Sequence, residues 1–262
     1  MSARFSSSSA HWYDRDGNPV HEVPYADKKR AGEMRPTTLR DARKLHLVPS
    51  VTTITKMINR EQLTSWKMGI VAEVALDCNP VWFETREEAI QHIVRRSEER
   101  MMYAAEVGTE MHDAIATILV DPTATTVLPD ATRDAVLRFM EDDGVVAEAI
   151  EHPFATSTYG GTIDMIAWAP APVVVDWKTQ DTLGRDSVRV YDEWAWQLAA
   201  YRSGIGRARA GAWNVVISRD EPGRMEVITY SEQELSKAEK IFLLLRDVWM
   251  AINNYNQAEM EA

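Results

Sequence analysis

The sequence predicts an α/β protein with a mixed central β-sheet flanked by helices and a helical N-terminal half. Segments with helical periodicity fill most of residues 49–144, which we expect to be mainly helical. Strand-like segments and helices then alternate over residues 145–258, a pattern typical of a sheet with helices packed on it. No break in composition separates these parts, so we expect one domain over residues 1–262.

The segment before Pro49 carries weaker signals. Residues 1–10 are rich in serine and are expected to be disordered. The segment from His11 to Val23 alternates around Asp16-Gly17-Asn18, which is typical of a small hairpin. A basic, loop-like segment follows as far as Val48.

Caps and periodicity place the remaining elements. Ser50 or Thr52 is suited to cap the first helix. Ser231 and Glu234 resemble a capping box that opens a C-terminal helix over 231–258. The other helices are expected at 60–76, 86–120, 131–143 and 191–204, and the strands of a sheet-bearing core (145–230) at 145–152, 162–168, 173–177, 210–217 and 225–230.

Composition restricts the functional class. The formal net charge of −11 predicts weak non-specific binding to DNA, although a local stripe of Lys and Arg can bind phosphate on an acidic protein. One cysteine, Cys78, excludes a disulfide framework and a cysteine-ligated iron–sulfur cluster. No apolar run reaches the roughly 20 residues that span a bilayer, and no secretory signal is evident, so we expect a protein of the reducing cytoplasm. The candidate basic stripes are 28–30, 35–44 and 202–209, and the alternative for each is an ordinary solvated face.

Two carboxylates and a lysine are predicted to gather on one hairpin. The turn signal Ala169-Pro170-Ala171 lies between two apolar runs, and a hairpin centred on Pro170 pairs residue 168 with 172 and residue 164 with 176. Asp164 then lies opposite Asp176, with Cβ atoms about 5 Å apart. Lys178, two residues beyond Asp176, projects from the same face of the strand.

Such a pair of carboxylates indicates a metal site. The two charges repel each other unless a cation lies between them, and oxygen ligands favour Mg²⁺ or Mn²⁺. A neighbouring lysine can orient or deprotonate a water molecule. The alternative is a surface hairpin in which Asp176 and Lys178 form a solvated ion pair. Asp176 argues against it, because it follows Val173-Val174-Val175 in a strand expected to be mostly buried.

Further residues are candidates for the same site, each with a structural alternative. Gln197 and Tyr201 share a helix face, where they are suited to contacting a nucleotide or, alternatively, to capping the sheet edge and filling the core. His112 is either a third metal ligand or a structural histidine. Glu148 or Glu151 is a further candidate carboxylate. The sequence has no Gly-rich phosphate loop, which disfavours a phosphatase or nucleotide hydrolase.

Together these residues resemble the PD-(D/E)xK nuclease superfamily, specifically its RecB-like exonuclease branch. That branch carries a helical histidine, an Asp after a small-residue turn, an Asp/Glu-x-Lys strand and a Gln-x-x-x-Tyr helix, in this order. The resemblance implies a restriction-endonuclease-like core. The matching residues here are His112, Asp164, Asp176 with Lys178, and Gln197 with Tyr201.

A second resemblance covers the region from residue 47 onward. Leu47-Val-Pro-Ser-Val-Thr-Thr-Ile54, with Trp66-Lys67 downstream, is similar to the front of phage-encoded exonucleases and of the mitochondrial genome maintenance exonuclease. The resemblance implies a stand-alone, metal-dependent DNA exonuclease that prefers single strands or free ends and acts in the host cytoplasm if it is phage-encoded. A structure-specific DNA endonuclease and a non-catalytic DNA-end-binding subunit are the alternatives.

The resemblance also implies a role for each residue. One or two Mg²⁺ or Mn²⁺ ions polarise the scissile phosphate, and Lys178 orients the attacking water. Because the net charge is acidic, we expect a narrow basic channel that leads to the hairpin. The implied metal ligands are His112, Asp164, Asp176 and the backbone carbonyl of Trp177. The implied substrate-binding residues are Gln197, Tyr201, Ser50 and Thr52.

Overall fold

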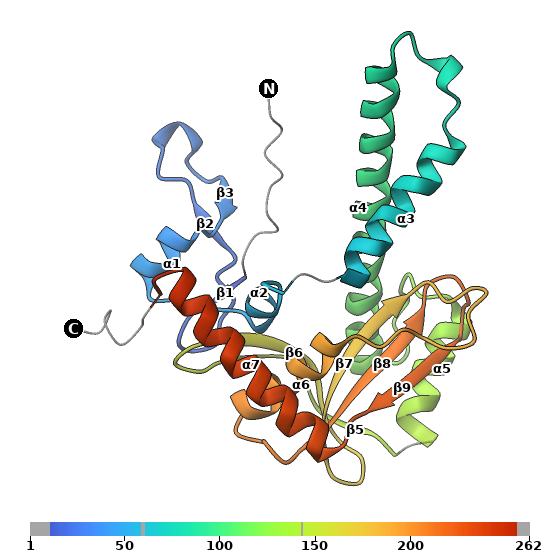
Figure 1. Cartoon of the computed structure of the whole chain (residues 1–262). Helices are drawn as coiled ribbons and strands as arrows, with labels where there is room; N and C mark the ends of the chain where they lie inside the picture. Colours follow the sequence, from blue (N-terminus) through green and yellow to red (C-terminus); the bar gives the residue numbers. More distant parts are fainter. Residues whose placement is uncertain (1–10, 59–60, 143, 256–262) are drawn as a thin grey trace.

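The computed structural model of the chain describes residues 11–58, 61–142 and 144–255. It consists of a five-stranded mixed sheet with helices on both faces, a small N-terminal region and a helical arm that projects away from the sheet (Figure 1). The predicted α/β class with a mixed central sheet is therefore confirmed. The expected disorder of residues 1–10 lies outside the described residues. The helix expected over 231–258 ends earlier, at Ile252, where Asn253 caps it, and only residues 256–258 of that range lie outside the described residues.

The sheet combines an antiparallel meander with one parallel crossover. Its strand order follows the sequence, and all neighbouring strands are antiparallel except β7 and β8. Helix α6 (Asp192–Gly204) connects these two parallel strands, because a parallel pair cannot be joined by a tight turn. The strands are β5 (Val146–Ala155), β6 (Gly160–Trp168), β7 (Pro172–Gln180), β8 (Gly211–Ser218) and β9 (Met225–Thr229).

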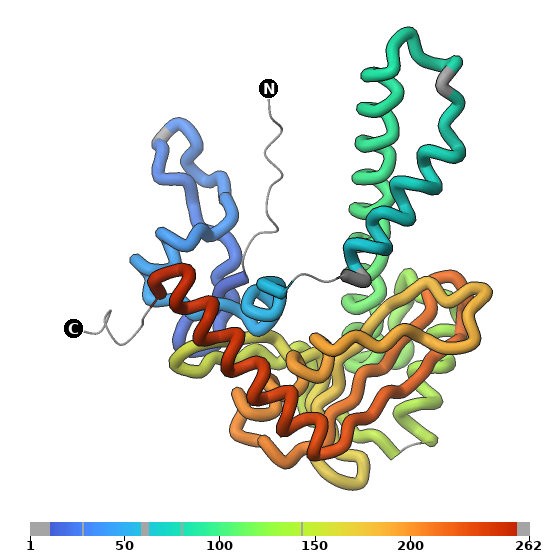
Figure 2. The backbone as a smooth tube through the Cα atoms, in the orientation of Figure 1, coloured from blue at the N-terminus to red at the C-terminus, as the bar shows by residue number. Residues whose placement is uncertain are grey.

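Helices cover both faces of the sheet, and Figure 2 shows α6 and α7 crossing one of them. Side chains alternate across β7, so Val174 packs with Leu198 of α6 while Val175 packs against the core beneath α4 and α5. Asp176 and Lys178 share the side of Val174 and therefore face α6. The four helices are α4 (Arg86–Val120), α5 (Asp130–Asp142), α6 (Asp192–Gly204) and α7 (Glu232–Ile252).

The hairpin predicted for residues 11–23 forms only in part. Its turn is present and Tyr13 bridges Pro19, but β1 pairs with β4, and β2 pairs with β3. Long-range packing explains the difference, because the buried ring of Trp12 lies 5.9 Å from that of Trp249 in α7. The elements here are β1 (Trp12–Tyr13), β2 (Glu22–Pro24), η1 (Lys28–Arg30), β3 (Met34–Pro36), α1 (Leu39–Leu45), β4 (Val48–Pro49) and α2 (Val51–Thr55).

The expectation of a loop-like segment before Val48 is wrong, because this segment contains helix α1. Thr38 and Asp41 form a capping box at the start of this helix. Asp41 also accepts two hydrogen bonds from Arg35, at 2.6 and 2.8 Å. The basic segment 35–44 therefore includes a paired arginine and a structured helix rather than a continuous free stripe.

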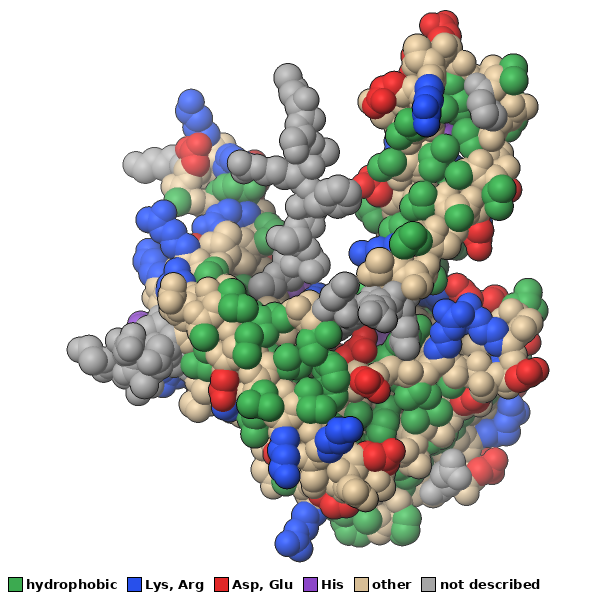
Figure 3. Space-filling view, in the orientation of Figure 1, with side chains coloured by type: hydrophobic (Ala, Val, Ile, Leu, Met, Phe, Trp, Pro, Cys, Tyr) green, Lys and Arg blue, Asp and Glu red, His purple; other side chains and the backbone are tan. Residues whose placement is uncertain are grey.

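The helical arm consists of α3 (Glu61–Asp77), a short turn η2 (Pro80–Trp82) and the first part of α4. It projects beyond the sheet, and Figure 3 shows apolar side chains spread over its surface. Leu76 and Trp82 are 87% and 69% exposed. The arm thus contributes little to the core, whereas the later part of α4 packs under the sheet through Ile115.

The predicted elements of the sheet-bearing core are all present, and β5, β6 and β7 are longer than expected. β7 continues to Gln180, beyond its predicted end at residue 177, because Lys178 and Gln180 pair with Val216 and Ser218 of β8. Polar residues at the end of a strand resemble a loop in the sequence, but this strand is an interior one. Among the described residues, no helix combines the length and apolar character needed to cross a membrane.

Substitution of Leu198 tests the packing that holds α6 on the sheet. Leu198 is fully buried, so Leu198→Ala should lower the free energy of unfolding by about 2–5 kcal/mol. Leu244→Ala on α7 is the control, because Leu244 is 66% exposed and its loss should change stability by less than about 0.5 kcal/mol. Urea titration followed by circular dichroism measures both. Equal stabilities of the two variants would contradict this packing.

Candidate active site

The β6–β7 hairpin brings Asp164 to the backbone of β7. The predicted register is confirmed from Trp168↔Pro172 to Met165↔Val175. Beyond that pair, the side chain of Asp164 replaces the backbone ladder: its Oδ2 accepts a hydrogen bond of 2.7 Å from the N–H of Trp177. Asp164 is thus fixed beside Asp176 by a short local contact.

The carboxylate of Asp176 is buried and fully engaged. It is only 2% exposed. Its Oδ2 lies 2.6 Å from Nζ of Lys178 and accepts a hydrogen bond of 2.7 Å from Asn214. Its Oδ1 accepts one of 2.9 Å from Gln197. A buried charge requires such partners, so the alternative of a solvated surface pair is wrong.

Gln197 connects both charged groups to helix α6. Its Oε1 accepts a hydrogen bond of 3.2 Å from Lys178, while its Nε2 donates to Asp176 and, at 2.8 Å, to the hydroxyl of Tyr201. The ring of Tyr201 is buried and packs edge-on against Phe154, with centroids 5.7 Å apart. Tyr201 is therefore a core aromatic whose polar end supports the site.

Two residues of this network were missed in the sequence. Asn214 on β8 is fully buried and lies next to Asp176 in the parallel register. The hydroxyl of Tyr230 donates a hydrogen bond of 2.8 Å to Oδ1 of Asn214. One signal was available, since Asn214 is a single amide inside an apolar strand, and a buried amide needs polar partners.

Helix α4 brings His112 to the same site. Its Nδ1 lies 3.5 Å from Oδ2 of Asp164. Gly108 allows this approach, because a Cβ there would lie 3.2 Å from Oγ1 of Thr179 on β7. Burial lowers the pKa of His112, which favours the neutral imidazole. A neutral imidazole is the form that binds metals.

The site has more negative than positive charge. Burial, followed by the charge of Asp176, raises the pKa of Asp164 well above its usual value, although Lys178 and the N–H of Trp177 act in the opposite direction. The pKa of Tyr201 is raised well above its usual value, by burial and then by the same two carboxylates. One lysine therefore does not neutralise the pair, and a further cation would be stabilised here.

The donor set fits a divalent metal ion in its chemistry, but its side chains are engaged with one another. Among the described residues, no three His, Cys, Asp or Glu side chains converge closely enough to hold a metal. Asp176 uses both oxygens on Lys178, Gln197 and Asn214. Binding of an ion to Asp176 would therefore require this carboxylate to release one of these partners.

The two glutamates considered for the site have different positions. Glu148 accepts a hydrogen bond of 2.6 Å from Arg207, on the exposed side of β5. Glu151 lies between the pairs Ile150↔Met165 and His152↔Ile163, opposite Asp164, in the left-handed region with a φ of 49°. Its charge contributes to the raised pKa of Asp164. Glu151 thus borders the site, and Glu148 does not.

Ser50 and Thr52 are engaged in local contacts. Ser50 caps α2, and its Oγ accepts a hydrogen bond of 2.9 Å from the N–H of Thr53. The hydroxyl of Thr52 lies 3.0 Å from that of Ser50. Capping by Ser50 is thereby confirmed, while contact of either residue with a phosphate stays a prediction.

A cleft of about 530 Å³ opens beside Lys178. The arginines that line this cleft are not those of the candidate stripe at 202–209. That segment does not form a free basic stripe, because Arg202 is buried against Glu232 and Arg207 pairs with Glu148. The lining includes four aromatic residues and three arginines besides Lys178. These are Trp66, Tyr191, Trp194, Trp196, Arg185, Arg189 and Arg219.

Comparison with known proteins agrees with this geometry. Residues 140–262 match the family model of the PD-(D/E)XK nuclease superfamily. The match implies a nuclease acting on DNA, and members of that superfamily generally use divalent metal ions, typically Mg²⁺. The mixed sheet and its helices are consistent with a restriction-endonuclease-like core.

The other comparisons add little. One solved structure that resembles the chain, "Crystal structure of SSO0001", is 16% identical, with 58% of this chain and 69% of that chain covered and a TM-score of 0.29. A search of curated proteins returned no match.

Asn214→Leu tests how far Asp176 depends on the amide of β8. The variant leaves one oxygen of a buried carboxylate with fewer donors, so unfolding should become easier by about 1–3 kcal/mol. Tyr230→Phe removes only the outer hydrogen bond and should change stability by about 1 kcal/mol or less. Chemical denaturation of both variants measures the difference. An Asn214→Leu protein as stable as Tyr230→Phe would contradict the network.

Proposed function

We propose that this chain is a metal-dependent deoxyribonuclease that acts as an exonuclease on single strands or free DNA ends. One observation carries the proposal: Asp164, Asp176 and Lys178 lie together where β6 and β7 cease to pair, within the segment that matches the nuclease superfamily. His112 and the Gln197–Tyr201 pair support the RecB-like branch in particular, because both contact this set. We also propose that the whole chain works as one domain.

The proposed metal ligands are Asp164, Asp176, His112 and the backbone carbonyl of Trp177. The excess negative charge at Asp164 supports a cation there, and the oxygen-rich donor set supports Mg²⁺ or Mn²⁺. When bound, the ion would stabilise the negative charge that develops on the phosphate during hydrolysis.

The protein's own groups then position the reactants. Lys178 holds a proposed attacking water for in-line approach to the phosphorus, because its ammonium group donates several hydrogen bonds. Asp176 and Gln197 fix the position of that ammonium group, at 2.6 and 3.2 Å. Tyr201, buried behind them, contributes through the amide of Gln197 rather than by touching DNA.

The surroundings of Lys178 support a substrate with unpaired bases. Its Nζ lies 6.0 Å from the ring centre of Trp194, in a cleft that also includes Trp66 and Trp196. Aromatic side chains stack on bases that are not held in a duplex. A purely DNA-binding subunit is less well supported, because binding alone does not require two buried carboxylates.

Cleavage of end-labelled DNA tests the proposed activity. The purified chain should degrade linear single strands in Mg²⁺ or Mn²⁺ and lose activity in excess chelator, because the carboxylate pair then lacks its counter-ion. A circular single strand of the same sequence should resist cleavage. Products resolved on gels measure both. Rapid cleavage of the circle would show an endonuclease, and intact linear DNA in both metals would contradict the nuclease.

Lys178→Ala tests the central residue. The rate of cleavage should fall by about 10²–10⁴-fold, the range for a group that positions or transfers a proton. Binding of DNA in chelator should change little, because one of several cationic contacts is lost. Lys237→Ala is the control, since Lys237 is exposed on α7. A Lys178→Ala enzyme with near-normal turnover would show that the site is assigned wrongly.

A further inference from the structure

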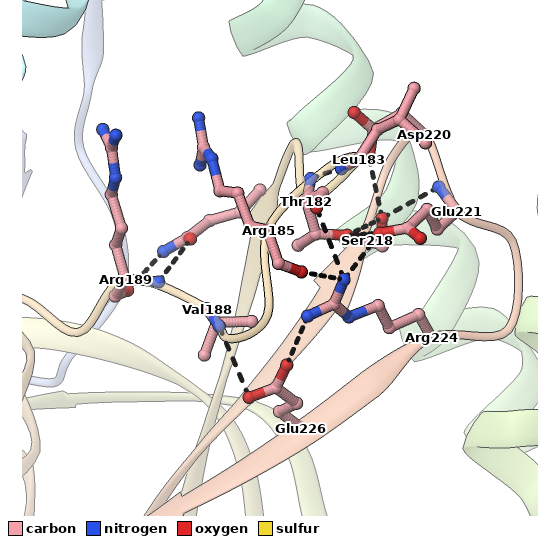
Figure 4. Close-up of polar contacts among 11 residues, drawn as sticks. Thr182, Leu183, Arg185, Val188, Arg189, Ser218, Asp220, Glu221, Arg224 and Glu226 are labelled. Carbon is pink, nitrogen blue, oxygen red and sulfur yellow. Dashed lines mark hydrogen bonds and ion pairs between the residues drawn. The ribbon is translucent and has the colours of Figure 1, made fainter.

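We infer that the loop 181–189 is a preformed binding site for the phosphates of a single-stranded polynucleotide, which Arg185 and Arg189 hold beside Lys178. The inference extends the proposed nuclease function, on which it rests, by assigning the strand that leads to the site. Figure 4 shows the loop and the contacts that hold it.

The tip of the loop is a tight turn. The N–H of Arg185 donates a hydrogen bond of 2.9 Å to the carbonyl of Thr182. Gly184 adopts a φ of 74° at the third position of this turn, where a side chain would be strained. The turn therefore fixes the direction in which Arg185 leaves the backbone.

The turn is anchored to the connection between β8 and β9. Thr182 is fully buried; its hydroxyl bonds to Ser218 at 2.6 Å, and its N–H bonds to Asp220 at 2.7 Å. Arg224 donates a hydrogen bond of 2.9 Å to the carbonyl of Arg185. These contacts come from a segment more than thirty residues away, so the loop is held from outside as well as by its own turn.

Gln180 holds the other end of the loop. Its buried side chain accepts a hydrogen bond of 3.0 Å from the N–H of Arg189 and donates one of 2.6 Å to the carbonyl of the same residue. Both backbone groups of Arg189 are thereby fixed by a single amide. Gln180 lies two residues beyond Lys178 on β7, so the loop and the proposed active site share one strand.

The guanidinium groups of Arg185 and Arg189 have no acidic partner among the described residues. In Figure 4 both side chains extend in the same direction, away from the contacts below them. Neighbouring arginines differ: Arg219 pairs with Asp181, and Arg224 pairs with Glu221. The chain has a net charge of −11. Two arginines on one fixed loop that have no acidic partner among the described residues are therefore suited to binding an anion.

The cleft beside the loop supports a single strand. Both arginines line it together with half-buried Trp66 and Tyr191, whose ring faces are suited to stacking on bases. The first turn of α6 contributes Asp192 and Glu193 to the same lining, so phosphates are expected at the arginines of the loop and not at the start of this helix. The volume of about 530 Å³ is that of a ligand pocket and fits one or two nucleotides rather than a duplex. One group of basic side chains in Figure 3 lies at this end of the sheet, below the arm.

Salt-dependent binding of a labelled oligothymidylate to the full chain in chelator tests the inference. The double variant Arg185→Ala/Arg189→Ala should bind about tenfold more weakly or worse. The slope of log K against log salt should fall by about 1.4, since each phosphate contact on a single strand contributes about 0.7. Neither guanidinium supports the fold, so thermal unfolding should match that of the unmodified chain.

The matched control is Arg138→Ala/Arg209→Ala, which removes the same charge elsewhere. Both residues are exposed; Arg138 lies on α5, across the sheet, and Arg209 precedes β8, at the end opposite the loop. The control should keep nearly the full salt slope. If the two double variants behave alike, or if a blunt duplex competes as well as the single strand through the same arginines, the inference is overturned.

Cleavage by the unmodified chain separates this inference from the proposed function. Binding that depends on Arg185 and Arg189 without any cleavage in Mg²⁺ or Mn²⁺ would support the binding site and contradict the nuclease. Cleavage that proceeds with normal affinity in the Arg185→Ala/Arg189→Ala variant would support the nuclease and overturn the binding site.

Discussion

The buried carboxylate of Asp176 is the constraint on which the arrangement of this molecule depends. A charge that is 2% exposed is tolerated only if it is paired and hydrogen-bonded. Its partners come from three elements: Lys178 on β7, Gln197 on α6 and Asn214 on β8. The parallel β7–β8 pair and its crossover helix are therefore held together by one side chain as well as by hydrophobic packing.

The surplus of negative charge follows from adding Asp164 to this network. Asp164 lies on a different strand, β6, and contacts β7 by accepting a hydrogen bond from the N–H of Trp177. Burial, followed by the charge of Asp176, raises the pKa of Asp164, and Lys178 offsets only part of this effect. A fold built only for stability would avoid such a pair, because replacing buried charges with apolar groups is often neutral or stabilising. The arrangement is better explained by chemistry than by stability.

Local patterns in the sequence predicted those features of the site that depend only on residues close together in the chain. The hairpin register and the position of Lys178 follow from a turn and the alternation of a strand, within fifteen residues of chain. Asn214 lies 38 residues from Asp176, and its place beside that carboxylate depends on a parallel register set by packing of α6. The pairing of β1 with β4 likewise depends on the contact of Trp12 with α7.

The pairing of the arginines shows most clearly that local sequence patterns do not predict tertiary contacts. The arginines of 202–209 form a candidate basic stripe in the sequence, yet Arg202 pairs with Glu232 and Arg207 pairs with Glu148. Which arginines remain unpaired is decided by tertiary structure, and Arg185 and Arg189 form no recognisable run. Because Gln180 fixes Arg189 from the strand that carries Lys178, a displacement of β7 would move the proposed phosphate site and the proposed catalytic lysine together. An acidic protein can thus confine its attraction for a polyanion to the end of β7 and the loop that follows it, beside the proposed catalytic lysine.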